Sequence, residues 1–267
     1  MGDNVDQLQK TIAIQTLQKQ QNEQDKQQQS QYLQLTEAQY EVQQTAKEVA
    51  DTASAKIKAM LFQVAGVSQV PTFGQAIDVA TAVSKIVPIR PAFLLAIISQ
   101  ESALGKNVGQ CLLTNKVTGE GKKISSGAYM SRVFKVSRDL QPFLNITASV
   151  GRDPLSSPIS CDTFGSMGPA QFLPSTWALF VNRLKTALGQ TADPWAVKDS
   201  FTASALYLSD LGAGAQTTTA ESTAAYHYNG SGNAARIYSR TVMQRATCIQ
   251  TFIDSNTMSS DCQNLIF

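Results

Sequence analysis

The sequence predicts a mainly α-helical protein, in which a bundle of roughly seven or eight helices with one small β-hairpin follows a long coiled-coil helix. Two patterns lead to this fold class. Apolar residues recur at helical spacing through most of 75–253, and residues 5–62 follow a heptad pattern without glycine or proline. The hairpin is predicted where helical spacing stops, within 111–130.

The N-terminal residues 1–64 are predicted to form a Gln-rich coiled-coil arm, which a linker at 65–74 joins to a globular domain at 75–267. The stripe of the arm advances by alternating three- and four-residue steps through Leu35, Ala38, Val42, Thr45, Val49 and Thr52. Glutamine interrupts this stripe over 21–31, so the seam would pack weakly. We expect residues 5–62 to bind a coiled-coil partner or to self-associate. The alternative is a partly disordered, low-complexity lead.

The globular domain is predicted to be a succession of short helices. The expected helices are 75–87, 91–105, 138–150, 175–188, 194–211, 220–228 and a last one after 232, with the hairpin over 117–124 and a loop over 152–165. Proline and glycine suggest several helix ends: Pro91 and Pro194 suit first helical positions, whereas Gly105 and Gly189 suit helix stops.

One carboxylate falls on the apolar side of the helix expected at 91–105. Glu101 follows Leu94, Ile97 and Ile98 at spacings of seven, four and three residues, so its side chain should face the core. Burial disfavours the charged form and would raise the pKa of Glu101, as a general acid near neutral pH requires. The alternative is that the helix frays at its end and that the carboxylate points into water.

Composition narrows the function classes. The 267 residues carry a net charge of +2, which is too small to indicate nucleic-acid binding but is compatible with an anionic polymer as substrate. No apolar run is long enough to be a transmembrane segment. The chain lacks an Asp-x-Asp-x-Asp-Gly pattern for calcium, and we expect neither a metal ion nor a cofactor.

The four cysteines, which form no CxxC pair, predict two disulfides and a location outside the cytoplasm. Pairing by proximity joins Cys111 to Cys161 and Cys248 to Cys262, one of three possible connectivities. Four buried free thiols are the alternative. A Cys/His peptidase dyad with His227 is conceivable, although no cysteine has a recognisable nucleophile context. The polar N-terminus contains no secretory signal, so the export signal is expected to be absent from this chain.

Three further segments carry groups that suit a sugar-binding site. In Gly165–Trp177, two glycines three residues apart allow close backbone approach to a ligand, and Gln171 can donate and accept hydrogen bonds. The aromatic and amide groups of Tyr226–Gly232 suit stacking and hydrogen bonding. Asp193–Trp195 would cap the next helix. Taken alone, each segment also fits an ordinary structural role at a helix end.

Together, in this order and spacing, the four segments resemble the lytic transglycosylase superfamily, which cleaves bacterial peptidoglycan and has a lysozyme-like helical fold. Glu101-Ser102 resembles the catalytic Glu-Ser of that family. Gly165–Trp177 is similar to its Gly-x-Met-Gly-x-x-Gln-Phe-x-Pro-Ser-x-aromatic signature, the most specific of the matches. Two weaker motifs are matched by Asp193-Pro194 with Tyr207-Leu208 and by Tyr228-Asn229. The resemblance covers roughly residues 85–245, departs in the long stretch 106–164, and leaves the arm unexplained.

The resemblance implies cleavage of the β-1,4 bond between N-acetylmuramic acid and N-acetylglucosamine in peptidoglycan glycan strands, in the periplasm or cell envelope. Glu101 would protonate the glycosidic oxygen and then take the proton of the muramyl C6 hydroxyl, which gives a 1,6-anhydro product. The resemblance assigns substrate contacts to Gln171, Tyr228 and Asn229, with Ser166 and the backbone of Met167 as secondary contacts.

Two other functions stay open at this point. A goose-type lysozyme on the same fold would hydrolyse the bond with a water molecule positioned by Asp153 or Asp162. Alternatively, the chain is a non-catalytic scaffold of the cell envelope, in which the coiled coil is the functional part and the globular domain only binds glycan.

Overall fold

The computed structural model describes residues 71–162 and 164–267, so the predicted coiled-coil arm and most of the linker lie outside the described residues. The long helices are α3 (Phe73–Ser84), α4 (Pro91–Ser102), α5 (Gln141–Ser149), α6 (Pro174–Leu188), α7 (Val197–Asp210), α8 (Thr218–Asn229), α9 (Gly232–Ser255) and α10 (Ser260–Ile266). Two short helical turns are η1 (Val136–Leu140) and η2 (Ala213–Ala215). The strands are β1 (Cys111–Leu113), β2 (Gly121–Lys123) and β3 (Tyr129–Met130). The predicted mainly α class is confirmed.

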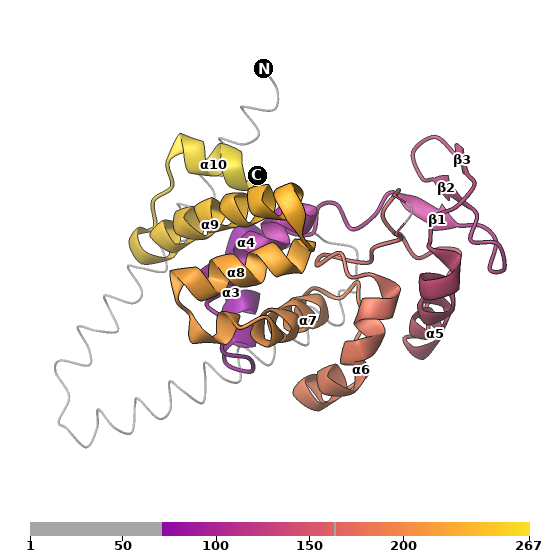
Figure 1. Ribbon diagram of the computed structural model, residues 1–267, viewed down its shortest axis with the longest axis horizontal. Helices are drawn as coiled ribbons and strands as arrows, with labels where there is room; N and C mark the ends of the chain where they lie inside the picture. Colours follow the sequence, from indigo (N-terminus) through magenta and orange to yellow (C-terminus); the bar gives the residue numbers. More distant parts are fainter. Residues whose placement is uncertain (1–70, 163) are drawn as a thin grey trace.

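Helix α4 is the centre of the fold. It packs against α3, α7, α9 and α10, and Figure 1 shows it enclosed within this group of helices. Every residue from Ala92 to Ile98 is completely buried, because this segment is apolar on all sides rather than along one stripe. Pro91 at the first helical position fixes where α4 begins. The far end of α4 therefore has a well-determined position, and Glu101 lies there.

A small antiparallel sheet lies beside α5, away from the group of helices around α4 (Figure 1). Strand β2 pairs with β1 and β3, with Leu112 opposite Lys122 and Lys122 opposite Tyr129. The sequence predicted a hairpin at 117–124, but the connection between β1 and β2 occupies residues 114–120. Its turn is closed by Asn115, whose side-chain oxygen accepts hydrogen bonds from two following backbone N–H groups.

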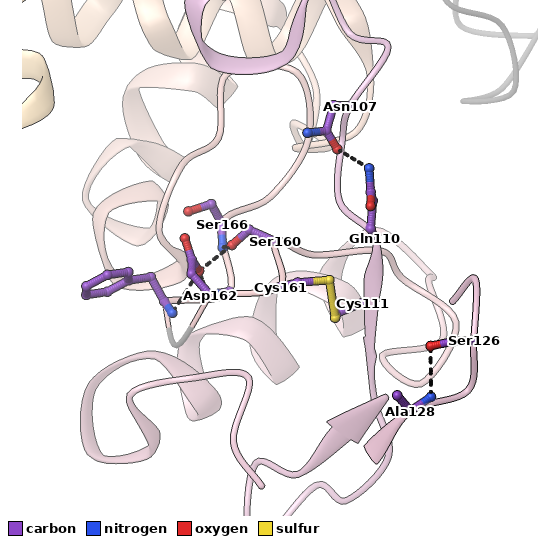
Figure 2. The surroundings of a disulfide bond; sticks show 11 residues. Asn107, Gln110, Cys111, Ser126, Ala128, Ser160, Cys161, Asp162 and Ser166 are labelled. Carbon is purple, nitrogen blue, oxygen red and sulfur yellow. Dashed lines mark hydrogen bonds between the residues drawn. A yellow bond between two sulfur atoms is a disulfide. The ribbon is translucent and has the colours of Figure 1, made fainter. Parts of the chain in front are cut away.

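Both predicted disulfides are present, one between Cys111 and Cys161 and the other between Cys248 and Cys262. All four cysteines are therefore paired, which excludes the free-thiol alternative and the Cys/His dyad. The first disulfide ties β1 to the loop that leads into the glycine-rich segment, as Figure 2 shows. The second joins α9 to α10.

The predicted helices differ from the structure at three places. Pro194 does not open α7, which begins at Val197. The carboxylate of Asp193 instead accepts a hydrogen bond from the N–H of Trp195, and the N–H of Ala196 donates to the Asp193 carbonyl, so these residues form a turn before the helix. The sequence also gave no signal for α10, which is only seven residues long. Helix α3 begins at Phe73, within the range predicted as linker.

Candidate active site

Glu101 lies in the last turn of α4, and its side chain is half-buried. The hydroxyl of Tyr238 on α9 donates a hydrogen bond to Oε1 of Glu101 at 2.5 Å. Burial raises the pKa of Glu101 from 4.5 to about 7, and the Tyr238 hydrogen bond lowers it in part. The predicted burial and raised pKa are both found. The alternative of a frayed helix end is wrong, because α4 continues through the buried Ser102.

The chain after Glu101 is anchored to the glycine-rich segment. The hydroxyl of Ser102 donates to the carbonyl of Pro169 at 2.6 Å and accepts from the N–H of Gly105 at 2.8 Å. Ala103, Leu104 and Gly105 all have positive φ angles, which ends the helix abruptly at the catalytic candidate. Ser102 thus joins two of the motifs that are far apart in the sequence.

The glycines of the second motif serve the protein's own packing. A Cβ atom at Gly168 would overlap the carbonyl oxygen of Pro194, and one at Gly165 would overlap the ring of Phe134. Both glycines also have a φ of 64°. The interpretation that they allow a ligand to approach the backbone is therefore corrected. Gly168 lets the motif lie directly against Pro194 and Trp195, so the second and third motifs also meet, whereas Gly165 makes room for Phe134.

Three predicted contact residues lie along this glycine-rich loop. Gln171 is half-buried and donates from Nε2 to the carbonyl of Gly168 at 2.7 Å, which leaves its Oε1 as an acceptor. Met167 is fully buried, and its N–H donates to the carbonyl of Phe172 at 2.9 Å. Ser166 is almost buried, and its N–H donates to Oγ of Ser160 at 2.8 Å.

Tyr228 connects this loop to the Glu101 site. Its hydroxyl donates to the carbonyl of Ala170 at 3.1 Å and accepts from Oγ of Ser204 at 3.3 Å. Its ring lies parallel to that of Tyr238, with centroids 6.5 Å apart. Burial raises the pKa values of both tyrosines well above 10, so both hydroxyls stay protonated donors. Asn229 is exposed at the end of α8.

Tyr238 is the functional candidate that the sequence motifs missed. In the helix predicted after 232, Tyr238 shares an apolar stripe with Val242 and Ala246, and its ring is indeed buried. Because a buried tyrosine hydroxyl needs a hydrogen-bond partner, its place on the apolar stripe was the one sign in the sequence that Tyr238 meets a polar group. The sequence contains no indication that this partner is Glu101.

The carboxylates considered for positioning a water molecule are engaged in their own loops. Asp162 accepts from Oγ of Ser160 and from the N–H groups of Phe164 and Gly165, and Figure 2 shows it beside Ser160. Asp153 accepts from Ser156 Oγ and the Leu155 N–H, and these bonds lower its pKa. Both side chains are exposed and organise local turns.

A second buried carboxyl also has a raised pKa but a different setting. Burial raises the pKa of Asp199 to about 6. Its carboxylate accepts from the N–H of Asp193 at 2.9 Å, and Asp193 forms an ion pair with Arg152 at 2.7 Å. This group holds the turn before α7 in place and gives no reason to assign it to the reaction.

Among residues 71–162 and 164–267, no helix combines the length and apolarity needed to cross a membrane. In the same part of the chain, no three His, Cys, Asp or Glu side chains are grouped so that they could hold a metal ion. The absence of a metal stays a prediction.

A family model agrees with these motifs. The model of the family described as "Transglycosylase SLT domain" matches residues 3–247. No curated protein matches. Among solved structures, the chain is similar to the Escherichia coli lytic transglycosylase Slt35 in complex with bulgecin A, with 15% sequence identity and a TM-score of 0.48. The match covers 74% of this chain and 74% of that one.

Proposed function

The chain belongs to the transglycosylase SLT domain family, and on that premise we propose that Glu101 is its single catalytic acid and base. The substrate is a peptidoglycan glycan strand. The bond cleaved is the β-1,4 bond between N-acetylmuramic acid and N-acetylglucosamine, and the product carries a 1,6-anhydro end. One arrangement carries the proposal: Glu101 lies at the end of a buried helix with no counter-ion among the described residues, burial raises its pKa to about 7, and the adjacent Ser102 bonds to the glycine-rich motif at Pro169.

The raised pKa fits both proton transfers. In the first, neutral Glu101 donates its proton to the glycosidic oxygen as that bond to C1 breaks. In the second, the carboxylate takes the proton of the muramyl C6 hydroxyl, whose oxygen forms the new bond to C1. The leaving sugar thereby keeps the first proton, and Glu101 regains the second. A group that must give and accept a proton works best when its pKa is near the operating pH.

The hydrogen bond from Tyr238 gives the two carboxyl oxygens of Glu101 different roles. Its hydroxyl already donates to Oε1, so Oε2 is the oxygen that faces the substrate and carries the transferred proton. The same hydrogen bond favours the carboxylate that forms after the first step. Tyr238 is thus a positioning residue for the catalytic acid.

We assign substrate binding to the groups that remain available near Glu101. Gln171 offers Oε1 to a sugar hydroxyl or amide N–H, and Asn229 offers an exposed side-chain amide. Tyr228 contributes its ring edge and the position of the loop rather than a free hydroxyl. Ser166 and Met167 support this loop from within the protein.

The disulfides fit an extracytoplasmic protein, and the proposed substrate places the enzyme in the periplasm or cell envelope. We propose that residues 1–64 form a coiled-coil arm that binds a partner or a second copy through 5–62, that a linker leads from residue 65 to the start of α3, and that the catalytic domain covers the residues from α3 to 267.

Product analysis tests the reaction. Purified peptidoglycan is digested with the full chain, and the released muropeptides are analysed by mass spectrometry. We expect 1,6-anhydromuramyl ends, which lack one water relative to reducing ends. Reducing ends would show that the enzyme is a hydrolase, and no release at all would support the scaffold function.

The catalytic assignment is tested with Glu101→Gln, which keeps the shape and a hydrogen-bond acceptor for Tyr238. Because the amide can neither donate nor regain the required proton, turnover should fall by at least about 10³-fold. The matched control is Asp199→Asn, which removes the other buried carboxyl with a raised pKa and should leave most activity. Full activity of the Glu101→Gln variant would overturn the proposal.

A further inference from the structure

A groove between α8 and α9 lies outside the site described above. It has a volume of about 580 Å³ and is lined by Thr218, Ser222, Tyr226, Arg236, Ser239, Arg240, Met243, Gln244 and Thr247. We infer that this α8–α9 groove binds the carboxylates of a peptide stem of peptidoglycan. The inference rests on the proposed function, because it assigns a second part of the same substrate to this enzyme.

The charge of the groove indicates an anionic ligand. Arg236 and Arg240 are exposed one turn apart on α9, and in the described part of the chain no carboxylate pairs with either. Two like charges at this spacing destabilise a helix unless an anion lies between them. None of the residues that line the groove is acidic. Guanidinium groups present planar pairs of N–H donors that match a carboxylate.

The hydrogen-bonding groups of the groove also favour an acceptor. At its floor, Oγ of Ser239 donates to the Ser222 carbonyl at 2.7 Å, and the two hydroxyls bond to each other at 3.1 Å. The hydroxyl of Tyr226 accepts from the N–H of Gly232, which fixes this side chain. The two serine hydroxyls are therefore engaged with each other and with the backbone, whereas the arginines, the Gln244 amide and the hydroxyls of Tyr226 and Thr218 still have N–H or O–H groups to donate.

The groove is within reach of a stem whose sugar is bound at Glu101. Tyr226 and Tyr228 are two residues apart on α8, and Arg236 and Arg240 are each two residues from Tyr238 on α9. Two residues correspond to about 200° around a helix, so the groove lies on the opposite face of the same helix pair. A path around half the circumference of a helix about 10–12 Å wide is roughly 16–19 Å long, which matches the roughly 17 Å that an extended peptide of about five residues can span.

Binding of a synthetic stem peptide to the full chain gives a direct test. Titration calorimetry should detect binding of the peptide with free carboxylates, and Arg236→Gln/Arg240→Gln should weaken it about tenfold. Arg236→Lys/Arg240→Lys should weaken binding less than the glutamine pair does, because lysine keeps the positive charge but loses the paired N–H donors. Equal binding of a peptide with amidated carboxylates would overturn the inference. Competition by inorganic phosphate as strong as by the peptide would overturn it too, because the site would then serve another source of anions.

Cleavage kinetics link the groove to the reaction. On intact peptidoglycan, kcat/KM of Arg236→Gln/Arg240→Gln should fall about tenfold, whereas on glycan strands stripped of their stems it should equal the wild-type value. The matched control Lys85→Gln/Lys185→Gln removes two exposed charges outside the groove and should leave kcat/KM unchanged on both substrates. An equal loss on both substrates would overturn the inference. Absence of anhydro products from the wild type would instead overturn the proposed function, and the peptide titration would still decide the groove.

Discussion

The two ends of α4 each meet a carboxylate, and the two carboxylates have opposite surroundings. At the beginning of α4, Arg90 donates from Nε and Nη2 to the two oxygens of Glu221, at 2.9 and 2.5 Å, and from Nη1 to Gln250. At the end of α4, Glu101 receives one hydrogen bond from the neutral Tyr238. Within the described residues, Glu101 forms no ion pair.

This comparison separates a structural carboxylate from a chemical one. Glu221 is 1% exposed, yet its negative charge is matched by a guanidinium in a two-point contact. Glu101 has lost much of its hydration without gaining a cation, so its neutral form is favoured near pH 7. Burial alone therefore does not identify a catalytic acid. Glu101 differs from Glu221 in being buried without a counter-ion in the described part of the chain, and it differs from Asp199 in lying at the family's Glu-Ser motif.

Breaking the pair at the beginning of α4 should have the largest effect on stability. Glu221→Gln leaves the Arg90 guanidinium without its counter-charge in a largely buried position, and it should lower the free energy of unfolding by about 3 kcal/mol. Urea denaturation at pH 7 measures this change, while turnover per folded molecule should be unaffected.

The exposed ion pair between Arg183 and Asp210 is the control for this prediction. Asp210→Asn removes the same kind of contact in water and should cost less than about 1 kcal/mol. Equal losses in the two variants would contradict the structural role assigned to Glu221.

Replacing Glu101, at the end of α4, by glutamine should raise the free energy of unfolding, whereas Glu221→Gln lowers it. Between pH 4.5 and about 7 the folded protein holds a proton on Glu101 that the unfolded chain has released. The free energy of unfolding is therefore not reduced by Glu101 below pH 4.5, and it falls as the pH rises from 4.5 through 7. Glu101→Gln should gain about 2 kcal/mol over the wild type at pH 8 and nothing at pH 4, after allowance for its partial exposure.

Thermal or urea unfolding at the two pH values measures this difference. A variant that is less stable than the wild type at both pH values would mean that Glu101 is a structural residue like Glu221. A gain confined to the higher pH would confirm that the enzyme keeps an unfavourable charge at its active site.

Much of this site follows from local pattern in the sequence. Glu101 was predicted to be buried because helical spacing places it on the face of Ile97 and Ile98, and that spacing needs no knowledge of the fold. The disulfides followed from an even count and short separations, 50 residues for Cys111–Cys161 and 14 for Cys248–Cys262. Such features depend on neighbours in sequence.

What the sequence could not predict depends on tertiary contacts or on nearly equal local choices. Tyr238 is 137 residues from Glu101, and an apolar stripe predicts that its ring is buried but not which group its hydroxyl meets. Asp193 can cap a helix or close a turn with the same carboxylate, and contact with Arg152 and Asp199 accompanies the turn. Strands as short as β1–β3 carry too few residues to show alternation.

The smallest predicted effect tests how Tyr238 tunes Glu101. In the wild type, kcat/KM should fall above about pH 7 as Glu101 loses the proton needed for the first step. The Tyr238 hydrogen bond lowers the pKa of Glu101, so Tyr238→Phe should move this alkaline limb upward by roughly one pH unit. It should also lower kcat without a matching rise in KM, because the acid is less well oriented.

Tyr228→Phe is the control: its hydroxyl bonds to Ala170 rather than to Glu101, so KM should rise while the limb stays in place. A limb that moves to lower pH in Tyr238→Phe would show that this hydrogen bond favours the neutral acid, and Tyr238 would then have no part in regenerating the base.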